Sequence, residues 1–209
     1  MTRSNLLKKV TFLGVLLLLL TSQFSQAQIG LSLRFLPADG RYHVYLTPSA
    51  EPTGVNATLT DGSSQITIIS STGGNLLPTN IVTVGTATTW SLITAARNNG
   101  DIASGAPANT DFFVFGPSGN FNLAYVANQE IELFNFTVSG TCTGDLSFLP
   151  SANQTAAGGT LNIGSFYSVR GFTGGLGTNH FTTTYLMNAP CDTTTPVVCA
   201  PQAQVLSKN

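Results

Sequence analysis

Apolar and polar residues alternate in short segments of this chain, and turn-forming residues separate the segments. Residues 29–35 and 41–47 show this alternation on either side of the turn-forming stretch 37–40. A period of two places successive side chains on opposite faces of a strand. We therefore expect two neighbouring antiparallel strands, each with one apolar and one polar face.

Similar strand signals recur along the chain as far as residue 169. The further segments expected to be strands are 65–70, 81–84, 88–95, 111–115, 121–126, 130–138, 145–149 and 161–169. Segments 111–115 and 121–126 are joined by Gly-Pro-Ser-Gly-Asn, which predicts a hairpin. About nine or ten short strands predict an all-β fold, a two-sheet antiparallel β-sandwich of jelly-roll type.

The segment from Glu130 to Val138 does not alternate in the simple way. Its apolar residues lie on one face up to Leu133 and on the other face from Phe134 onward. Either both faces of this strand are covered, or a β-bulge near Leu133 resets the register. Both interpretations favour a two-layer sandwich.

The amino-terminal residues predict that the protein is exported. Basic residues precede an apolar run, 10–20, that is too short to cross a bilayer, which takes about 20 helical residues. A small-x-small pattern ends at Ala27, so we expect a secretory signal peptide over 1–27. The remaining expectations are one sandwich domain over 28–191, an unstructured tail over 192–209, no membrane span, and a secreted, extracellular or periplasmic location.

Charge is scarce, and this excludes some partners. Only 8% of residues are charged, against about 25% in typical soluble domains. After the predicted cleavage, five basic residues remain against nine acidic ones. Nucleic acid and anionic lipid both require clustered Lys and Arg, so neither is an expected partner. Hydroxyl and amide groups must make up most of the polar surface.

Three cysteines remain after the predicted cleavage, at positions 142, 191 and 199. Export permits their oxidation, and an odd number leaves one without an intramolecular partner. We favour a disulfide between Cys142 and Cys191, because both flank segments that we expect to fold. A Cys191–Cys199 pair is the alternative.

The sequence favours a protein without catalytic residues. It contains neither a GxSxG nor an HExxH motif, and its two histidines, His43 and His180, are not in a recognisable catalytic pattern. Glu130 and Glu132 share a strand face at a spacing that a glycosidase pair could use. Acids at a strand entrance more often keep the strand soluble, which is the interpretation we favour.

The best candidate for ligand binding is a polar and aromatic stripe formed by Arg41, His43 and Tyr45. These residues alternate along one strand and share its polar face. Trp90 is a second candidate, although core packing is favoured for it. No DxDxDG calcium loop occurs, so we expect no metal site or other cofactor, with calcium as the less favoured possibility.

The order of four segments resembles the cohesin-like β-sandwich modules of exported proteins from Bacteroidetes-type bacteria. The segments are Trp90, Asp111-Phe112-Phe113-Val114-Phe115, Glu130-Ile131-Glu132-Leu133-Phe134-Asn135-Phe136 and Cys142-Thr143-Gly144-Asp145-Leu146. This resemblance covers about residues 28–191 and implies a jelly-roll module that binds or scaffolds other proteins. Related carbohydrate-binding modules share that fold.

The expected function is therefore that of an exported, non-catalytic binding or structural module, acting in adhesion, matrix structure or scaffolding through protein contacts. A carbohydrate-binding module with a polysaccharide partner is the alternative. A hydrolase acting on polysaccharide is the third possibility.

Overall fold

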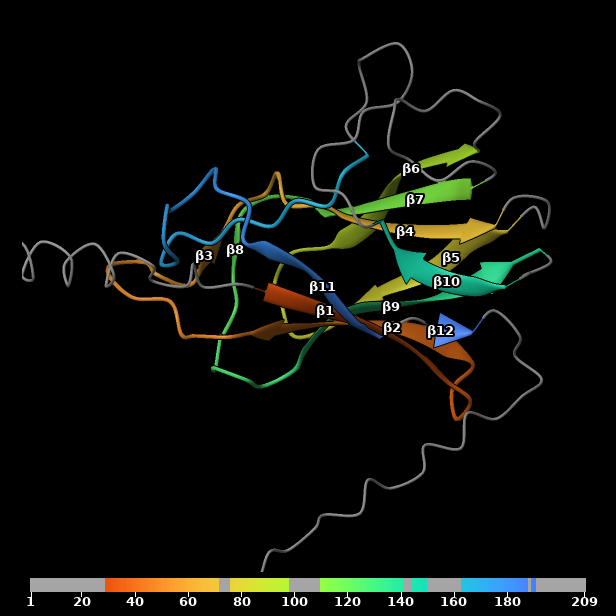
Figure 1. Ribbon diagram of the computed structural model, residues 1–209, viewed down its shortest axis with the longest axis horizontal. Coiled ribbons are helices and arrows are strands. Elements are labelled where there is room, and N and C mark those ends of the chain that lie inside the picture. The colour runs from red at the N-terminus through yellow and green to blue at the C-terminus, as the bar shows by residue number, and fades with distance from the viewer. Residues whose placement is uncertain are drawn as a thin grey trace, which may run out of the picture.

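Strands form nearly all the regular structure in the part of the chain that the computed structural model describes, residues 29–71, 76–97, 110–140, 144–149, 163–187 and 189–190. They lie in two five-stranded sheets and a two-stranded ribbon (Figure 1). The strands are β1 (Ile29–Leu36), β2 (Arg41–Pro48), β3 (Leu59–Thr60), β4 (Ile66–Ser71), β5 (Leu77–Thr83), β6 (Trp90–Arg97), β7 (Thr110–Pro117), β8 (Phe121–Asn122), β9 (Ile131–Ser139), β10 (Asp145–Phe148), β11 (Phe181–Met187) and β12 (Ala189–Pro190).

The two large sheets confirm the expected β-sandwich. The first sheet has the order β11-β1-β2-β9-β5 and the second β12-β10-β4-β7-β6. Neighbouring strands are antiparallel in both sheets, with one exception. β1 and β11 pair in parallel at the edge of the first sheet. From β4 onward the chain passes repeatedly from one sheet to the other. The jelly-roll type stays a prediction.

Strands β1 and β2 form the hairpin that their alternation predicts. They pair without a break from Ile29 opposite Pro48 to Leu36 opposite Arg41. In the turn, the Gly40 amide donates to the carbonyl oxygen of Leu36 at 2.9 Å, and Gly40 has φ 69°. Glycine adopts this left-handed conformation without the steric cost of a Cβ atom. One side of the hairpin faces the other sheet and the opposite side faces outward.

Strand β9 contains the bulge that was one of two interpretations of its sequence. Val44 lies opposite Phe134 and the next residue of β2, Tyr45, lies opposite Glu132, so Leu133 has no residue opposite it. Leu133 and Phe134 are consecutive and both are buried in the core. The bulge thus adds an apolar residue to the core without moving the polar residues of β9 to the wrong face.

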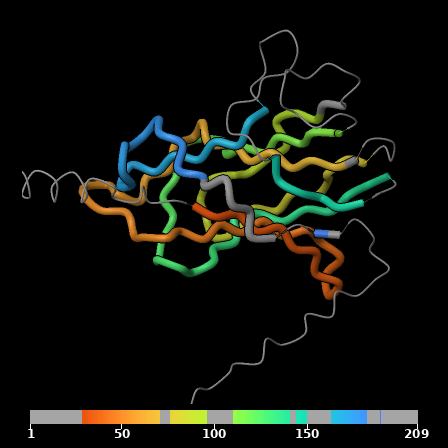
Figure 2. The backbone as a smooth tube through the Cα atoms, viewed as in Figure 1, coloured from red at the N-terminus to blue at the C-terminus, as the bar shows by residue number. Residues whose placement is uncertain are grey.

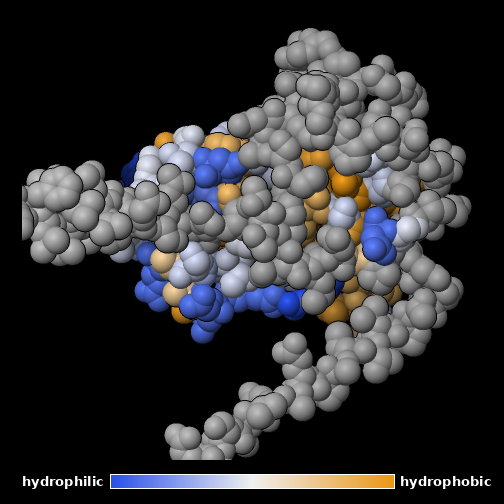
Figure 3. Space-filling view, viewed as in Figure 1, coloured by the Kyte–Doolittle hydropathy of each residue, from blue (hydrophilic) through white to orange (hydrophobic). Residues whose placement is uncertain are grey.

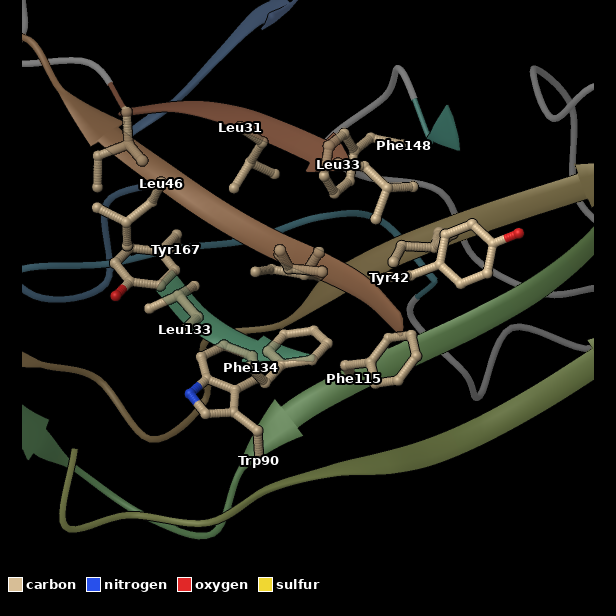
Figure 4. Packing of buried hydrophobic residues seen from close by; sticks show 14 of the residues in the cluster. Leu31, Leu33, Tyr42, Leu46, Trp90, Phe115, Leu133, Phe134, Phe148 and Tyr167 are labelled. Atoms are coloured by element: carbon tan, nitrogen blue, oxygen red, sulfur yellow. The ribbon is translucent and has the colours of Figure 1, made fainter. Parts of the chain in front are cut away.

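The core lies between the sheets and is rich in aromatic rings. Phe134 of β9 packs against Trp90 of β6 and Phe115 of β7, with ring centroids 5.1 and 4.9 Å apart (Figure 4). Trp90 is 1% exposed. This confirms the favoured interpretation of Trp90 as a core residue and removes it as a ligand anchor.

The predicted hairpin between segments 111–115 and 121–126 is wrong. Both edges of β7 are occupied, by β4 on one side and β6 on the other. The chain after the turn therefore leaves the sheet, and its only strand residues, Phe121 and Asn122, pair with β3. The turn residues predict a reversal of the chain, but they cannot predict which strand becomes the neighbour.

Other expectations differ from the structure or lie outside its described residues. The described residues of segment 161–169 do not form the expected strand. Two isolated β-bridges occur there instead, from Phe166 to Gln65 and from Val169 to Thr60. Strands β3, β11 and β12 were not expected from the sequence. The cysteines, the expected signal peptide over 1–27 and the expected tail over 192–209 all lie outside the described residues.

One end of the sandwich, at the left of Figure 2, consists of the connecting segments 49–58, 123–130 and 163–180, and we call it the loop end. Backbone hydrogen bonds join them, including Thr53 to the carbonyl of Gly171 at 2.9 Å and Asn128 to that of Pro48 at 2.7 Å. Figure 3 shows hydrophilic residues at this end and hydrophobic residues over the part where Figure 1 draws β4 and β7.

We expect Phe134→Ala to lower the free energy of unfolding by about 3–5 kcal/mol, because it removes a buried ring that contacts both sheets. Urea unfolding followed by circular dichroism measures this change. Val55→Ala is the control, since Val55 is 86% exposed and a change of less than about 0.5 kcal/mol is expected there. Equal effects of the two substitutions would contradict the assigned core.

Candidate functional site

The outer face of the first sheet carries a cluster of charged and polar side chains that we call the polar face. The register places Arg34, His43, Asn135 and Val82 side by side across β1, β2, β9 and β5. The polar face is defined as Arg34, Asp39, Arg41, His43, Tyr45, Glu130, Glu132 and Asn135. Its residues come from β1, the β1–β2 turn, β2, β9 and the residue before β9.

His43 lies at the centre of the polar face between two carboxylates. Its Nδ1 atom is 2.7 Å from Glu132 Oε1 and its Nε2 atom is 2.9 Å from Asp39 Oδ2. Asn135 Nδ2 also donates to Glu132 Oε1, at 2.8 Å. The imidazole side chain is only 7% exposed. His43 was expected on an exposed stripe, but these contacts bury it and occupy both its nitrogens.

Arg41 reaches across the sheet to hold the edge strand β5. Its guanidinium donates to Asn135 Oδ1 and to the carbonyl oxygen of Asn80. Asn80 has φ 50° and lies where the pairing of β5 with β9 is irregular. Arg41 therefore links β9 to the irregular part of β5 as well as adding charge to the polar face.

Tyr45 is partly exposed and is covered on its ring by a cation. The central carbon of the Arg34 guanidinium lies 4.9 Å from the centroid of the ring. Glu130 holds Arg34 in an ion pair and also accepts from Ser32 Oγ at 3.2 Å. Burial raises the pKa of Tyr45, as does Glu132, while Arg34 lowers it in part. The phenol therefore stays neutral at physiological pH.

The structure thus brings the three predicted residues Arg41, His43 and Tyr45 to one face, but it shows that they have partners within the chain. Sequence reasoning missed Arg34, Asp39 and Asn135 as members of this cluster. The alternation of β1 is the signal that could have placed Arg34 beside His43. Asp39 reads as a turn former, and its contact with His43 depends on the geometry of the turn.

Glu130 and Glu132, the acids considered for glycosidase chemistry, bind different bases. Glu130 pairs with Arg34, and Glu132 pairs with His43. A general acid needs a proton to give and a nucleophile needs an open path to its substrate. Each of these carboxylates instead accepts hydrogen bonds from neighbours on the polar face.

The outer face of the second sheet differs in kind from the polar face. Ile69 of β4 and Phe112 and Val114 of β7 form an apolar cluster there with Leu149 and Ile163. Phe112 is fully buried, as are Leu149 and Ile163. The side chains of this cluster are therefore buried, whereas the polar face presents partly exposed side chains.

Two of the edge strands, β5 in the first sheet and β6 in the second, have irregular pairing with their neighbours. β5 is irregular between Thr79 and Val82, and β6 is irregular between Leu92 and Thr94. Bulges at edge strands interrupt the row of open backbone groups that a further strand would need. β5 and β6 are therefore poorly suited to pairing with a further strand.

His180 is buried in the loop end and has a structural role. Its Nδ1 atom accepts from the backbone amide of Val169 at 3.1 Å, and its Nε2 atom faces the carbonyl oxygen of Thr173 at 3.1 Å. These contacts require a neutral ring with the proton on Nε2. Burial lowers the pKa of His180, and its hydrogen bonds with the backbone of Thr173 and Tyr167 oppose part of that change.

A second buried polar group joins the hydroxyls of Thr60, Tyr125 and Tyr167. The two tyrosine oxygens are 3.0 Å apart, and Thr60 contacts that of Tyr125. Burial raises the pKa of Tyr125 to about 12, and it raises that of Tyr167 well above the ordinary value. Both phenols stay protonated over the physiological range and link the loop end to the core.

No family model, curated protein or solved structure matches the chain. Within the described ranges, three or more His, Cys, Asp or Glu side chains are nowhere grouped so that they could hold a metal ion. The same part of the chain has no helix long and apolar enough to cross a bilayer. The polar face is thus assigned from its own geometry.

We expect the stabilising effect of His180 to depend on pH. The pKa of His180 in the folded state is lowered, so the unfolded chain binds a proton at higher pH than the folded one. The stability that the neutral ring contributes is complete above about pH 6.5 and is lost as pH falls through the folded-state pKa. Urea unfolding should show a gap between the free energies of unfolding of the wild type and of His180→Gln. This gap should be smaller at about pH 5 than at about pH 7.5.

The size of this gap at the higher pH follows from the contacts that are lost. His180→Gln should cost about 1–3 kcal/mol there, because it leaves a buried backbone amide without its acceptor. The same narrowing is expected when both chains also carry His43→Gln, which separates the two histidines. A gap that does not change with pH would contradict the assigned neutral ring.

Proposed function

We propose that this chain is an exported, non-catalytic module that binds a protein partner through the polar face. The observation that carries the proposal is the concentration of charge there. In a chain with 8% charged residues, five charged side chains and His43 gather on one face of one sheet: Arg34, Asp39, Arg41, Glu130 and Glu132.

Solubility alone does not require such a cluster, because hydroxyl and amide groups can supply polar surface in a chain with so few charges. Side chains that neighbours already hold in place lose less entropy when a partner binds. Arginine and tyrosine are also among the residue types that contribute most to protein interfaces. Arg34 and Tyr45, stacked and partly exposed, are therefore the proposed centre of the contact.

Apolar side chains on the same face add to this proposal. Leu36, Leu77 and Val82 are 36, 39 and 49% exposed, and their register places them on the outer side of the first sheet. An interface buries apolar area together with oriented polar groups. The two-layer architecture also agrees with the cohesin-like module that the sequence resembles, whose jelly-roll connectivity and scaffolding role belong to this proposal.

The alternative, a carbohydrate-binding module, depends on a free aromatic face. Tyr45 is the aromatic residue of the polar face, and the guanidinium of Arg34 already lies over its ring. A sugar could stack there only if Arg34 moved away from both Tyr45 and Glu130. This arrangement favours a protein partner over a polysaccharide.

Photo-crosslinking tests the proposed face. A photoreactive amino acid placed at Val82 should form an adduct with a protein exported by the source organism, while the same group at Val55 should not. Both positions are exposed, but Val55 lies in the loop end. Equal adducts at the two positions, or adducts at Val55 alone, would contradict the proposal.

We expect Arg34→Ala to weaken binding of the captured protein by about 10- to 100-fold, as truncation at an interface centre does. Arg170→Ala is the matched control, because Arg170 is exposed outside the polar face, and it should change affinity less than about twofold. Isothermal titration measures both. Binding to a glycan array that is lost in Tyr45→Ala and retained in Arg34→Ala would favour the carbohydrate alternative instead.

A further inference from the structure

The contact of His43 with two carboxylates joins parts of the chain that are far apart in sequence. Asp39 belongs to the β1–β2 turn, and Glu132 belongs to β9. The two nitrogens of one ring, at 2.7 and 2.9 Å from the carboxylate oxygens, connect these two elements. The position of the turn relative to β9 therefore depends on what the ring can donate.

Both carboxylates act as acceptors toward their other neighbours as well. Glu132 Oε1 accepts from Asn135 Nδ2 at 2.8 Å, and Asp39 Oδ1 accepts from the backbone amide of Arg41 at 3.1 Å. An ionised carboxylate can only accept, and a neutral imidazole has one donor and one acceptor nitrogen. Only the imidazolium form can donate to Asp39 and Glu132 at the same time.

The other charged side chains near His43 bind partners other than its ring. On β1, Arg34 lies opposite His43 and pairs with Glu130, which precedes β9. On β2, Arg41 donates to carbonyl oxygens of Asn80 and Asn135, and Tyr45 lies on the other side of the ring. In the same row, β5 contributes the apolar Val82. The charge on the ring is therefore what balances Asp39 and Glu132.

We propose that His43 is a proton-operated clamp on the β1–β2 turn. With a proton on each nitrogen, the ring holds Asp39 and Glu132 together. When the ring loses the proton on Nε2, a lone pair faces the Asp39 carboxylate, and that contact is lost. The ring donates from both nitrogens only while it carries both protons, so the clamp opens as pH rises.

Asp39 is the partner that the neutral ring releases. Its side chain is 42% exposed, against 21% for Glu132, and Glu132 is also held by Asn135. Release of Asp39 changes the shape of the turn, and the proton lost by the His43 ring removes one positive charge from the polar face. This last consequence, an effect of pH on partner binding, rests on the proposed function.

The test compares Asp39→Asn with the wild type in urea unfolding, without any partner. At about pH 5 the substitution should lower the folding equilibrium constant about fivefold, in the range expected for a partly exposed ion pair. At about pH 8.5 the loss should be less than about twofold. In chains that also carry His43→Gln, Asp39→Asn should have the same small effect at both pH values. Asp145→Asn is the matched control at an exposed aspartate, and it should show no such dependence.

Nitrogen-15 NMR of the His43 ring provides a second measurement that does not depend on stability. Both ring nitrogens should carry protons while the clamp is closed, and only Nδ1 once it has opened at higher pH. An equal effect of Asp39→Asn at both pH values would overturn the proposal. So would a neutral ring that carries its proton on Nε2 instead of Nδ1. Because neither experiment includes a partner, a failure of the clamp and a failure of the binding face are distinguishable.

Discussion

The bulge at Leu133 is the local feature on which both the core and the polar face depend. A strand can normally bury only every second side chain. By leaving Leu133 without an opposite residue, β9 buries Leu133, Phe134 and Phe136 and still turns Glu132 and Asn135 outward. The bulge thus completes the aromatic core on one side of β9 and positions Glu132 and Asn135, which surround His43, on the other side.

The two sheets differ in the polarity of their outer sides. The second sheet has apolar clusters on both of its sides, one in the core and one around Phe112 and Val114. The first sheet is apolar on its inner side and carries the ordered charges on its outer side. The edge strands β5 and β6 are irregular, and we propose the outer side of the first sheet as the surface for recognition.

Alternation in the sequence predicted the parts of the fold that depend on local geometry. It identified the β1–β2 hairpin, the burial of Trp90 and the possibility of a bulge near Leu133. It could not predict that β7 has no edge left for β8, or that β11 lies parallel to β1. Those pairings are decided by competition between strands that are distant in the sequence.

The candidate site shows the same division between local and distant information. The period of β2 placed Arg41, His43 and Tyr45 on one face, which is correct. The contact between His43 and Glu132 spans 89 positions in the chain, and that with Asp39 depends on how the turn folds back. No short motif encodes either contact, so the burial of His43 could be found only from the structure.

Deletion of one residue tests the role of the bulge most directly. Without Leu133, Glu132 and Phe134 become consecutive and keep their places opposite Tyr45 and Val44, so the chain should still fold, destabilised by about 2–5 kcal/mol for the lost leucine. Deletion of Leu33 from the regular β1 ladder moves every later residue of that strand to the wrong face, and that chain should not fold. Circular dichroism with urea unfolding compares the two deletions. Loss of folding in both would contradict the account.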